Sequence, residues 1–301
     1  MSFFKILLDG NSAKEREKKQ ICAIVIAITA LLLVVAILAF VICQVVDFTA
    51  NNDSDKEKDT QKETVDLGET TQTQLSDTAI YSGNLLTLND NKHYKGEPDN
   101  LINIYDNRNG AFLSVRMANR SKFEATADTV ENLCKMVSAC NEAINDDNLL
   151  VSNAYNTTEI SSQKGIYSSG EAIALSYFNS ESETGESPIN EDERYKWIYN
   201  NAHKYGFIAV SSKSNVFRYV GETHAAAAKT SGLYLDNYLK QLKNATVDSP
   251  MKLNASGNII AYTCPASDVR VPKNYESDTS GNNIDGIIVT VYLSKPINSV
   301  E

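Results

Sequence analysis

The sequence predicts an α+β fold, a small antiparallel sheet packed with helices, that follows a single transmembrane helix. Short segments in which apolar and polar residues alternate, typical of strands, are interleaved with segments whose apolar residues recur every three or four positions, as in helices. These segments lack the regular strand–helix–strand spacing of a parallel sheet, which indicates the α+β class. A long uncharged apolar segment near the start of the chain predicts the transmembrane helix.

The apolar segment covers residues 21–46, ICAIVIAITALLLVVAILAFVICQVV, and contains no charge, proline or glycine. As a helix it would be about 39 Å long against a hydrocarbon core of about 30 Å, so it could span a bilayer with some tilt. A secretory signal peptide is the alternative, but its apolar region typically covers only about 7–15 residues. We therefore expect a retained single-pass anchor.

The flanks of this segment predict its orientation. The first twenty residues contain five lysines and arginines, whereas the residues after position 46 are acidic. Because Lys and Arg stay on the cytoplasmic side, we expect a cytoplasmic tail over residues 1–20 and an extracytoplasmic domain at the cell membrane. Residues 47–78 carry nine acids, three lysines and few large apolar side chains, which predicts a disordered acidic linker.

The remaining residues are expected to form a folded domain over 79–248 and a C-terminal β extension over 249–301. This part of the chain is acidic, which argues against nucleic acid as a partner. It contains three cysteines, Cys134, Cys140 and Cys264. An odd number argues against a disulfide framework, so we expect buried thiols.

The elements follow from local patterns. The segment 125–145 is the strongest predicted helix, because Val130, Leu133 and Val137 recur at helical spacing. Residues 126–128 include side chains that are typical of a helix N-terminus. A second helix opens near residue 193 and is expected to end at Gly206 in a left-handed cap. Shorter helices are expected over 222–229 and 235–243. The predicted strands are 81–90, 111–118, 149–155, 171–178, 207–210, 216–220, 258–264 and 284–294, with a long polar loop between the last two.

Several of these segments also carry family motifs in the same order. WIYNNAHKYGF (197–207) is similar to the motif Trp-Leu-x-x-Asn-Ala-x-x-Tyr-Gly-Phe, and VFRYVG (216–221) to the tail of Glu-Pro-Trp-His-Phe-Arg-Tyr-Val-Gly. YSSGEAIA (167–174) resembles His-x-x-Gly-x-Ala-x-Asp, and LVSNAYNTTE (150–159) resembles a strand that ends in Ser-Gly-Tyr-Arg-Ser. Over roughly residues 80–245 the chain thus resembles the VanY-type D-alanyl-D-alanine carboxypeptidases, zinc enzymes that trim the last D-alanine from peptidoglycan stems.

The resemblance implies the fold of these zinc peptidases without the residues of their active site. Tyr167 and Val216 stand where the family has two metal-binding histidines, and Ala174 stands where it has a metal-binding aspartate. Lys213 replaces the general-base glutamate, and Asn156 replaces the arginine that holds the substrate carboxylate. We therefore expect no catalytic residue, no metal ligand and no cofactor, that is, a degenerate member of the family. The three histidines of the chain, His93, His203 and His224, fall at other positions and are interpreted as surface or packing residues.

A degenerate polar cleft could remain. Its candidate binding residues are Tyr155, Asn156, Tyr167, Glu171, Lys213 and Arg218. For Tyr155, Tyr167 and Glu171 the alternative is an ordinary position on a sheet face, and for Arg218 it is a charge that orders the neighbouring strand.

Two functional hypotheses follow. One is a membrane-anchored pseudoenzyme that binds a peptidoglycan stem peptide or a protein of the cell envelope. The other is an active D-alanyl-D-alanine carboxypeptidase of peptidoglycan metabolism with atypical ligands. Fold resemblance alone does not assign an activity, so both remain open at this point.

Overall fold

The structure is a computed structural model that describes residues 67–297 except 89–91, 93, 117–118 and 159–164. All described residues belong to one compact unit that begins near Glu63. The predicted anchor at 21–46 and the cytoplasmic tail lie outside the described residues. Within the described part, none of the helices has both the length and the apolar character needed to cross a membrane.

A central sheet organises the domain, with short antiparallel strands as predicted and one parallel pair. Its order is β3 (Ser114–Val115), β5 (Leu149–Asn153), β7 (Ala172–Phe178), β10 (Val216–Tyr219) and β9 (Phe207–Ala209), with β8 (Glu186–Pro188) on the side of β7. The parallel pair is β3 with β5. The strand predicted over 111–118 is reduced to the two residues of β3, because the chain turns at the positive-φ residues Asn109 and Gly110 directly before it.

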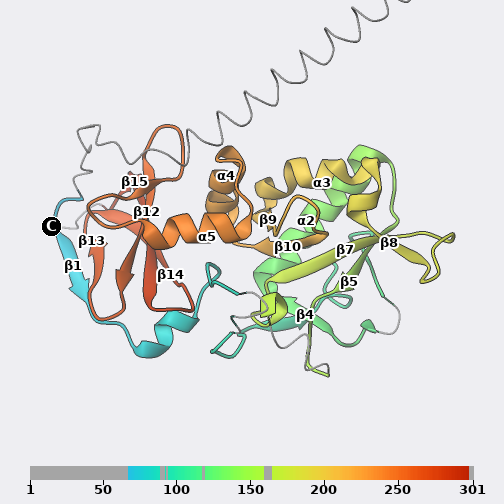
Figure 1. The fold of residues 1–301 in the computed structure, drawn as a ribbon, viewed down its shortest axis with the longest axis horizontal. Helices are drawn as coiled ribbons and strands as arrows, with labels where there is room; N and C mark the ends of the chain where they lie inside the picture. The colour runs from blue at the N-terminus through green and yellow to red at the C-terminus, as the bar shows by residue number, and fades with distance from the viewer. Residues whose placement is uncertain (1–66, 89–91, 93, 117–118, 159–164, 298–301) are drawn as a thin grey trace, which may run out of the picture. The chain divides into compact units, whose positions relative to one another are not determined.

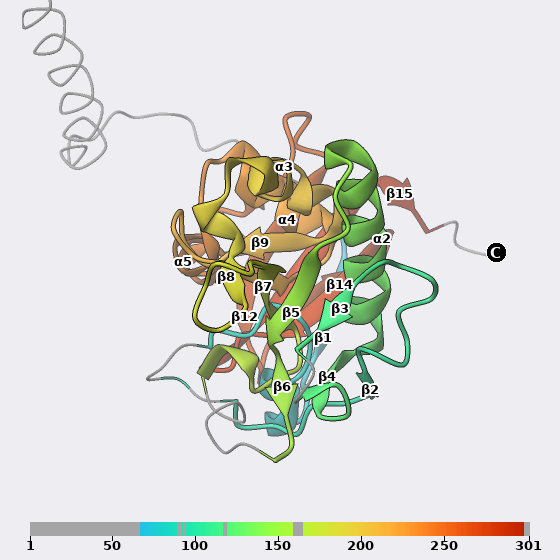
Figure 2. The same ribbon diagram turned by 90° about the vertical axis from the view of Figure 1, so that its right-hand side faces the viewer.

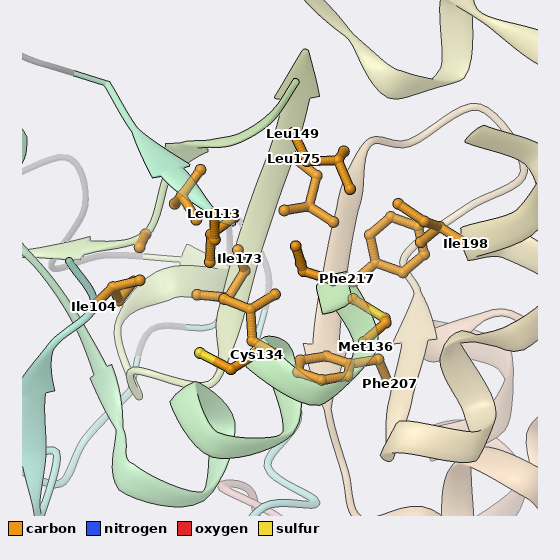
Figure 3. Packing of buried hydrophobic residues seen from close by; sticks show 14 of the residues in the cluster. Ile104, Leu113, Cys134, Met136, Leu149, Ile173, Leu175, Ile198, Phe207 and Phe217 are labelled. Carbon is orange, nitrogen blue, oxygen red and sulfur yellow. The ribbon is translucent and has the colours of Figure 1, made fainter. Parts of the chain in front are cut away.

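Helix α2 (Ala127–Ile144) covers one face of this sheet, and it confirms the predicted helix 125–145 except that residues 125 and 126 end a strand before it and Asn145 caps it. Thr126 caps its start by accepting a hydrogen bond from the backbone N–H of Thr129, and Asn145 ends it in the left-handed region at φ 52°. Figure 3 shows its Met136 in the same apolar cluster as Ile173 and Phe217 of the sheet. Figure 2 shows α2 beside β5 and β3. This cluster is the largest core of the domain.

The second predicted helix is present, but it is broken into short turns. The segment runs through two 3₁₀ turns and one α-helix: η5 (Glu193–Tyr195), α3 (Lys196–Asn201) and η6 (Ala202–Tyr205). It ends at Gly206, which has φ 80° and donates to the carbonyls of Ala202 and His203, as the left-handed cap predicts. Tyr195, Ile198 and Ala202 are all buried in the α2 cluster.

A second apolar cluster joins the residues before position 248 to the residues after it. It contains residues from α4 (Glu222–Thr230), α5 (Leu235–Asn244), β11 (Met251–Lys252), β12 (Ile259–Pro265) and β15 (Gly286–Pro296). Figure 1 shows α5 lying along β12. Thr263 of β12 also donates a 2.7 Å hydrogen bond from Oγ1 to the carbonyl of Leu242. The boundary expected at residue 248 therefore does not separate two cores.

Two expectations for the ends of the domain need correction. The last part of the expected linker is structured: β1 (Thr70–Thr73) pairs with β13 (Val269–Pro272), and a 3₁₀ turn, η1, covers Asp77–Tyr81. The polar loop expected between β12 and β15 likewise contains β13 and β14 (Tyr275–Gly281), and β14 pairs with β15 along its whole length. β1 and β14 were missed because their side chains are mostly polar. β13 was missed because its partner β1 is distant in the sequence.

A small three-stranded sheet lies beside α2, in the order β2 (Leu101–Asn103), β4 (Phe123–Thr126) and β6 (Tyr155–Asn156). The strand predicted over 81–90 is not found among its described residues. Leu85, Leu86 and Leu88 are nevertheless buried, so the sequence pattern identified buried residues that do not pair in a sheet.

Candidate ligand cleft

The register of three strands aligns a row of residues across the central sheet. Val216 of β10 is the Cα partner of Ala174 of β7, and on the other side of β7 Ala174 pairs with Asn153 of β5. The flanking residues Ile173 and Phe217 point into the α2 cluster. Because side chains alternate along a strand, Ala174 and Val216 face the side opposite α2.

Tyr167 reaches this row from a neighbouring loop. It ends the 3₁₀ turn η3 (Gly165–Tyr167), and its side chain forms a hydrogen bond with the side chain of Asn153. Burial raises the pKa of Tyr167 to about 12, which the hydrogen bond to Asn153 only partly opposes. The structure thus makes Ala174 and Val216 register partners and places Tyr167 beside Asn153, at one end of their row. Tyr167, Ala174 and Val216 are the three positions that the sequence motifs align with metal ligands.

The residues at these positions do not fit a zinc ion. A catalytic zinc site needs about three nitrogen, sulfur or carboxylate ligands and an open position for water. Ala174 and Val216 have no lone pair to donate, and a phenol with a pKa near 12 keeps its proton at neutral pH. Among the described residues, no group of three or more His, Cys, Asp or Glu side chains is arranged to hold a metal.

Glu171 and Arg218 form a buried ion pair next to this row. Arg218 is fully buried and donates from Nη2 to Glu171 Oε2 at 2.7 Å and from Nη1 to the carbonyl of Leu86 at 2.6 Å. Ser169 donates to the same carboxylate oxygen at 3.0 Å. Burial raises the pKa of Glu171, while Arg218 and Ser169 oppose that rise. The pair therefore ties the segment around Leu86 to β10.

Glu171 also borders a cavity of about 730 Å³ at the start of α2. Tyr94, Asp99, Asp128 and Tyr219 line it as well, and no lysine or arginine is found among its described lining residues. The pKa of Tyr94 is raised to about 12 by burial and by the nearby carboxylates of Glu171 and Asp99. A cavity lined by acidic side chains disfavours the binding of a carboxylate group. Sequence reasoning missed Tyr94 and Asp99, which lie in a loop without any motif.

The other predicted cleft residues belong to other elements. Tyr155 and Asn156 belong to β6 of the small sheet, where Tyr155 pairs with Glu124. Asn156 is buried, and its Oδ1 accepts hydrogen bonds from the N–H and the hydroxyl of Thr158. Lys213 is exposed in the loop between β9 and β10. Among the predicted cleft residues, Glu171 and Arg218 are thus directly paired.

Of the three histidines, His224 is the most deeply buried in the described chain. Its Nδ1 lies 2.7 Å from the hydroxyl of Tyr238, and its Nε2 lies 2.8 Å from the hydroxyl of Thr290. His224 thus packs α4 and α5 against β15, in agreement with the packing interpretation. His203 is half-buried on η6, and His93 lies outside the described residues.

Comparisons with known proteins place this geometry in context. No protein-family model matches the chain. A D-alanyl-D-alanine carboxypeptidase of Enterococcus faecium is 35% identical over 109 residues, which cover 32% of this chain and 36% of that protein. The chain therefore matches about a third of the length of this relative.

Two solved structures are similar. The vancomycin-resistance D,D-dipeptidase VanXYg, in complex with a D-Ala-D-Ala phosphinate analog, superposes with a TM-score of 0.57 at 21% identity, covering 75% of this chain and 100% of that one. The LdcB LD-carboxypeptidase gives a TM-score of 0.37 at 17% identity, covering 50% of this chain and 81% of that one. The chain thus has sequence similarity to a D-alanyl-D-alanine carboxypeptidase and shares the fold of a D,D-dipeptidase.

Proposed function

We propose that this protein is a non-catalytic, membrane-anchored module that uses a D,D-peptidase fold to bind a cell-wall stem peptide. The supporting observation is that Ala174 and Val216, two positions that the motifs align with metal ligands, are direct register partners, while Tyr167, the third such position, is bonded to Asn153 on the other side of Ala174. Ala174 and Val216 have no atom that binds a zinc ion. The proposal therefore keeps the fold and gives up hydrolysis, because the described residues at these positions supply too few ligands for a catalytic zinc.

The general base is missing as well. Hydrolysis of a peptide bond needs a group that accepts a proton from the attacking water. The aligned residue is Lys213, which is exposed in a loop. Glu171 directly precedes β7, but its oxygen Oε2 is already bound by Arg218 and Ser169.

The binding mode must differ from one that grips the terminal carboxylate of the peptide. Asn156 stands in place of the arginine expected there, and its Oδ1 is occupied by Thr158. The acid-lined cavity beside Glu171 would repel a carboxylate but accept an ammonium group. A stem peptide would therefore be held through its neutral or amino-bearing residues. A protein of the cell envelope is the other candidate occupant.

The decisive experiment combines metal analysis, activity and binding on the purified full-length chain. We expect no stoichiometric zinc, no release of D-alanine from a pentapeptide stem ending in D-Ala-D-Ala, and saturable binding of that peptide by calorimetry. One zinc per chain, or D-alanine release above a blank that a chelator abolishes, would favour the active carboxypeptidase. Absence of peptide binding by the folded chain would leave a protein as the partner.

The anchor is a separate part of the proposal, supported by the uncharged segment 21–46 and its basic N-terminal flank. Because β1 pairs with β13, we expect accessible linker cleavage sites only before Leu67. Protease added to intact cells should release the domain by cutting within residues 47–66. Cleavage that occurs only after lysis would reverse the orientation.

A further inference from the structure

Two exposed phenylalanines line one cavity at the C-terminal end of β7. Among the described residues, only Phe112, Phe178, Tyr234 and Ile297 are large apolar side chains with extensive exposure. Phe112 is 73% exposed and Phe178 is 53% exposed, and both line a cavity of about 540 Å³. Exposed aromatic rings gathered at a concave surface are typical of a binding site.

The backbone of Phe112 is held in place although its ring faces solvent. Its carbonyl accepts a 2.9 Å hydrogen bond from Nδ2 of Asn141 on α2. Arg108 braces the same loop: its guanidinium lies 3.7 Å from the centroid of Tyr105, Nε donates to the carbonyl of Tyr105 and Nη1 to that of Leu113. The site is therefore preformed, and a ligand would not have to order the loop.

Polar groups are interleaved with the two rings. Asp106, Asn109, Asp147 and Asn148 line the cavity together with Arg108, whose Nε and Nη1 donate to backbone carbonyls. The two carboxylates and the one guanidinium of this lining give it a formal charge of −1. Anionic ligands such as phosphate or a peptide carboxylate are disfavoured by this charge. An apolar helix is disfavoured because its docking would bury these carboxylates without partners.

We propose that this cavity binds a neutral oligosaccharide. A pyranose ring has one face of C–H groups, which packs on an aromatic ring, and a rim of hydroxyl or acetamido groups, which hydrogen-bond to carboxylate and amide side chains. The cavity supplies both kinds of partner, and its volume falls in the range of about 300–1,000 Å³ of small-ligand sites. The inference does not depend on stem-peptide binding at the cleft.

The test measures binding of the N-acetylglucosamine tetramer to the full-length chain by calorimetry and by saturation-transfer NMR. We expect saturable binding that Phe112→Ala and Phe178→Ala each weaken about tenfold or more. Tyr234→Ala removes an exposed aromatic ring outside this cavity and is the matched control, with unchanged affinity expected. Because the substituted rings are exposed, the variants should keep the melting temperature of the parent.

Two outcomes would overturn the proposal. One is the absence of tetramer binding by the folded parent chain at millimolar ligand. The other is equal affinity in Phe112→Ala, Phe178→Ala and Tyr234→Ala. Loss of stem-peptide binding in the same two phenylalanine variants would also count against a separate sugar site, since that peptide is assigned to the cleft.

Discussion

Nη2 of Arg218 lies 2.7 Å from Oε2 of Glu171, and the guanidinium of Arg218 is completely shielded from solvent. The carbonyl of Leu86 and the hydroxyl of Ser169 complete the polar contacts of the pair. Buried charges persist in a fold only when they are paired and hydrogen-bonded. The pair is therefore a structural connection, and Glu171 also lines the cavity at the start of α2.

Removing one partner of this pair should destabilise the fold strongly. In Glu171→Ala, Arg218 would remain buried without its carboxylate, which costs about 3–5 kcal/mol in comparable cases. Urea unfolding measures this change. The matched control is Glu69→Ala, which breaks the exposed pair with Lys273 and should cost less than about 1 kcal/mol. A loss below that level for Glu171→Ala would show that Arg218 is solvated or finds another partner.

His224 should make stability depend on pH in the acid range. Burial lowers its pKa from 6.5 to about 4, so the unfolded chain binds this proton more readily than the folded one. The stabilisation is complete above about pH 6.5 and is lost as the pH falls through 4, by roughly 3 kcal/mol in total.

The measurement compares urea unfolding of the parent and of His224→Gln between pH 7 and pH 4. The advantage of the parent should shrink as the pH falls. Glu171, whose pKa is raised, acts in the opposite direction but is present in both proteins and cancels in the difference. A difference that stays constant with pH would show that His224 does not titrate in this way.

Gly170 should tolerate no side chain. It has φ +78°, and an added Cβ would lie 2.5 Å from Cδ2 of Leu101 and 3.5 Å from the backbone nitrogen of Thr126. We expect Gly170→Ala to cost more than Gly185→Ala, by about 1–3 kcal/mol, because Gly185 has a similar φ of +73° but open space around it. Thermal unfolding of the two variants provides the comparison, and equal losses would mean that Leu101 moves away freely.

Restoring ligands should restore a metal site if the strand register is right. The triple variant Tyr167→His, Ala174→Asp and Val216→His places three ligands around one point, and it should gain zinc affinity that each single variant lacks. Zinc–nitrogen bonds of about 2.0–2.1 Å leave little tolerance for a shifted register. Equilibrium dialysis against zinc provides the measurement. A folded triple variant without zinc affinity would contradict the assigned alignment.

Hydrolysis is expected to stay absent in the triple variant. Lys213→Glu would supply the base, but residue 213 lies in an exposed loop. Asn156→Arg would supply the carboxylate anchor, but residue 156 lies in the small sheet. D-alanine release by the triple variant alone would show that neither addition is needed.

The sequence predicted best where local chemistry decides the structure. Helix 127–144 is capped by Thr126 and ends at Asn145 in the left-handed region. The helical segment before Gly206 ends at that glycine. Each of these signals lies within a few residues of the boundary that it sets. The strands around Ala174 and Val216 were found because their apolar residues are buried. The free, buried thiols of Cys134, Cys140 and Cys264 also agree with the odd number of cysteines.

Elements that depend on distant partners could not be predicted in the same way. β1 has a largely exposed TTQT sequence and exists because β13, some two hundred residues later, pairs with it. Leu85–Leu88 look like a strand but are buried as irregular chain, in part because Arg218 takes the carbonyl of Leu86. In the cleft, the individual residues Glu171 and Arg218 were identified, whereas their direct pairing needed the fold.

The ladder between β1 and β13 has a mechanical consequence. If the chain is anchored before residue 67, any tension between membrane and domain enters through β1, which is held by four residue pairs and by the exposed pair of Glu69 with Lys273. This short edge ladder bears the force before the central sheet does. Once it is pulled apart, Leu67 leaves its apolar cluster and Val269 loses its cover, while the row of Asn153, Ala174 and Val216 remains intact. The domain could therefore yield to a pull at its attachment point and still keep its cleft.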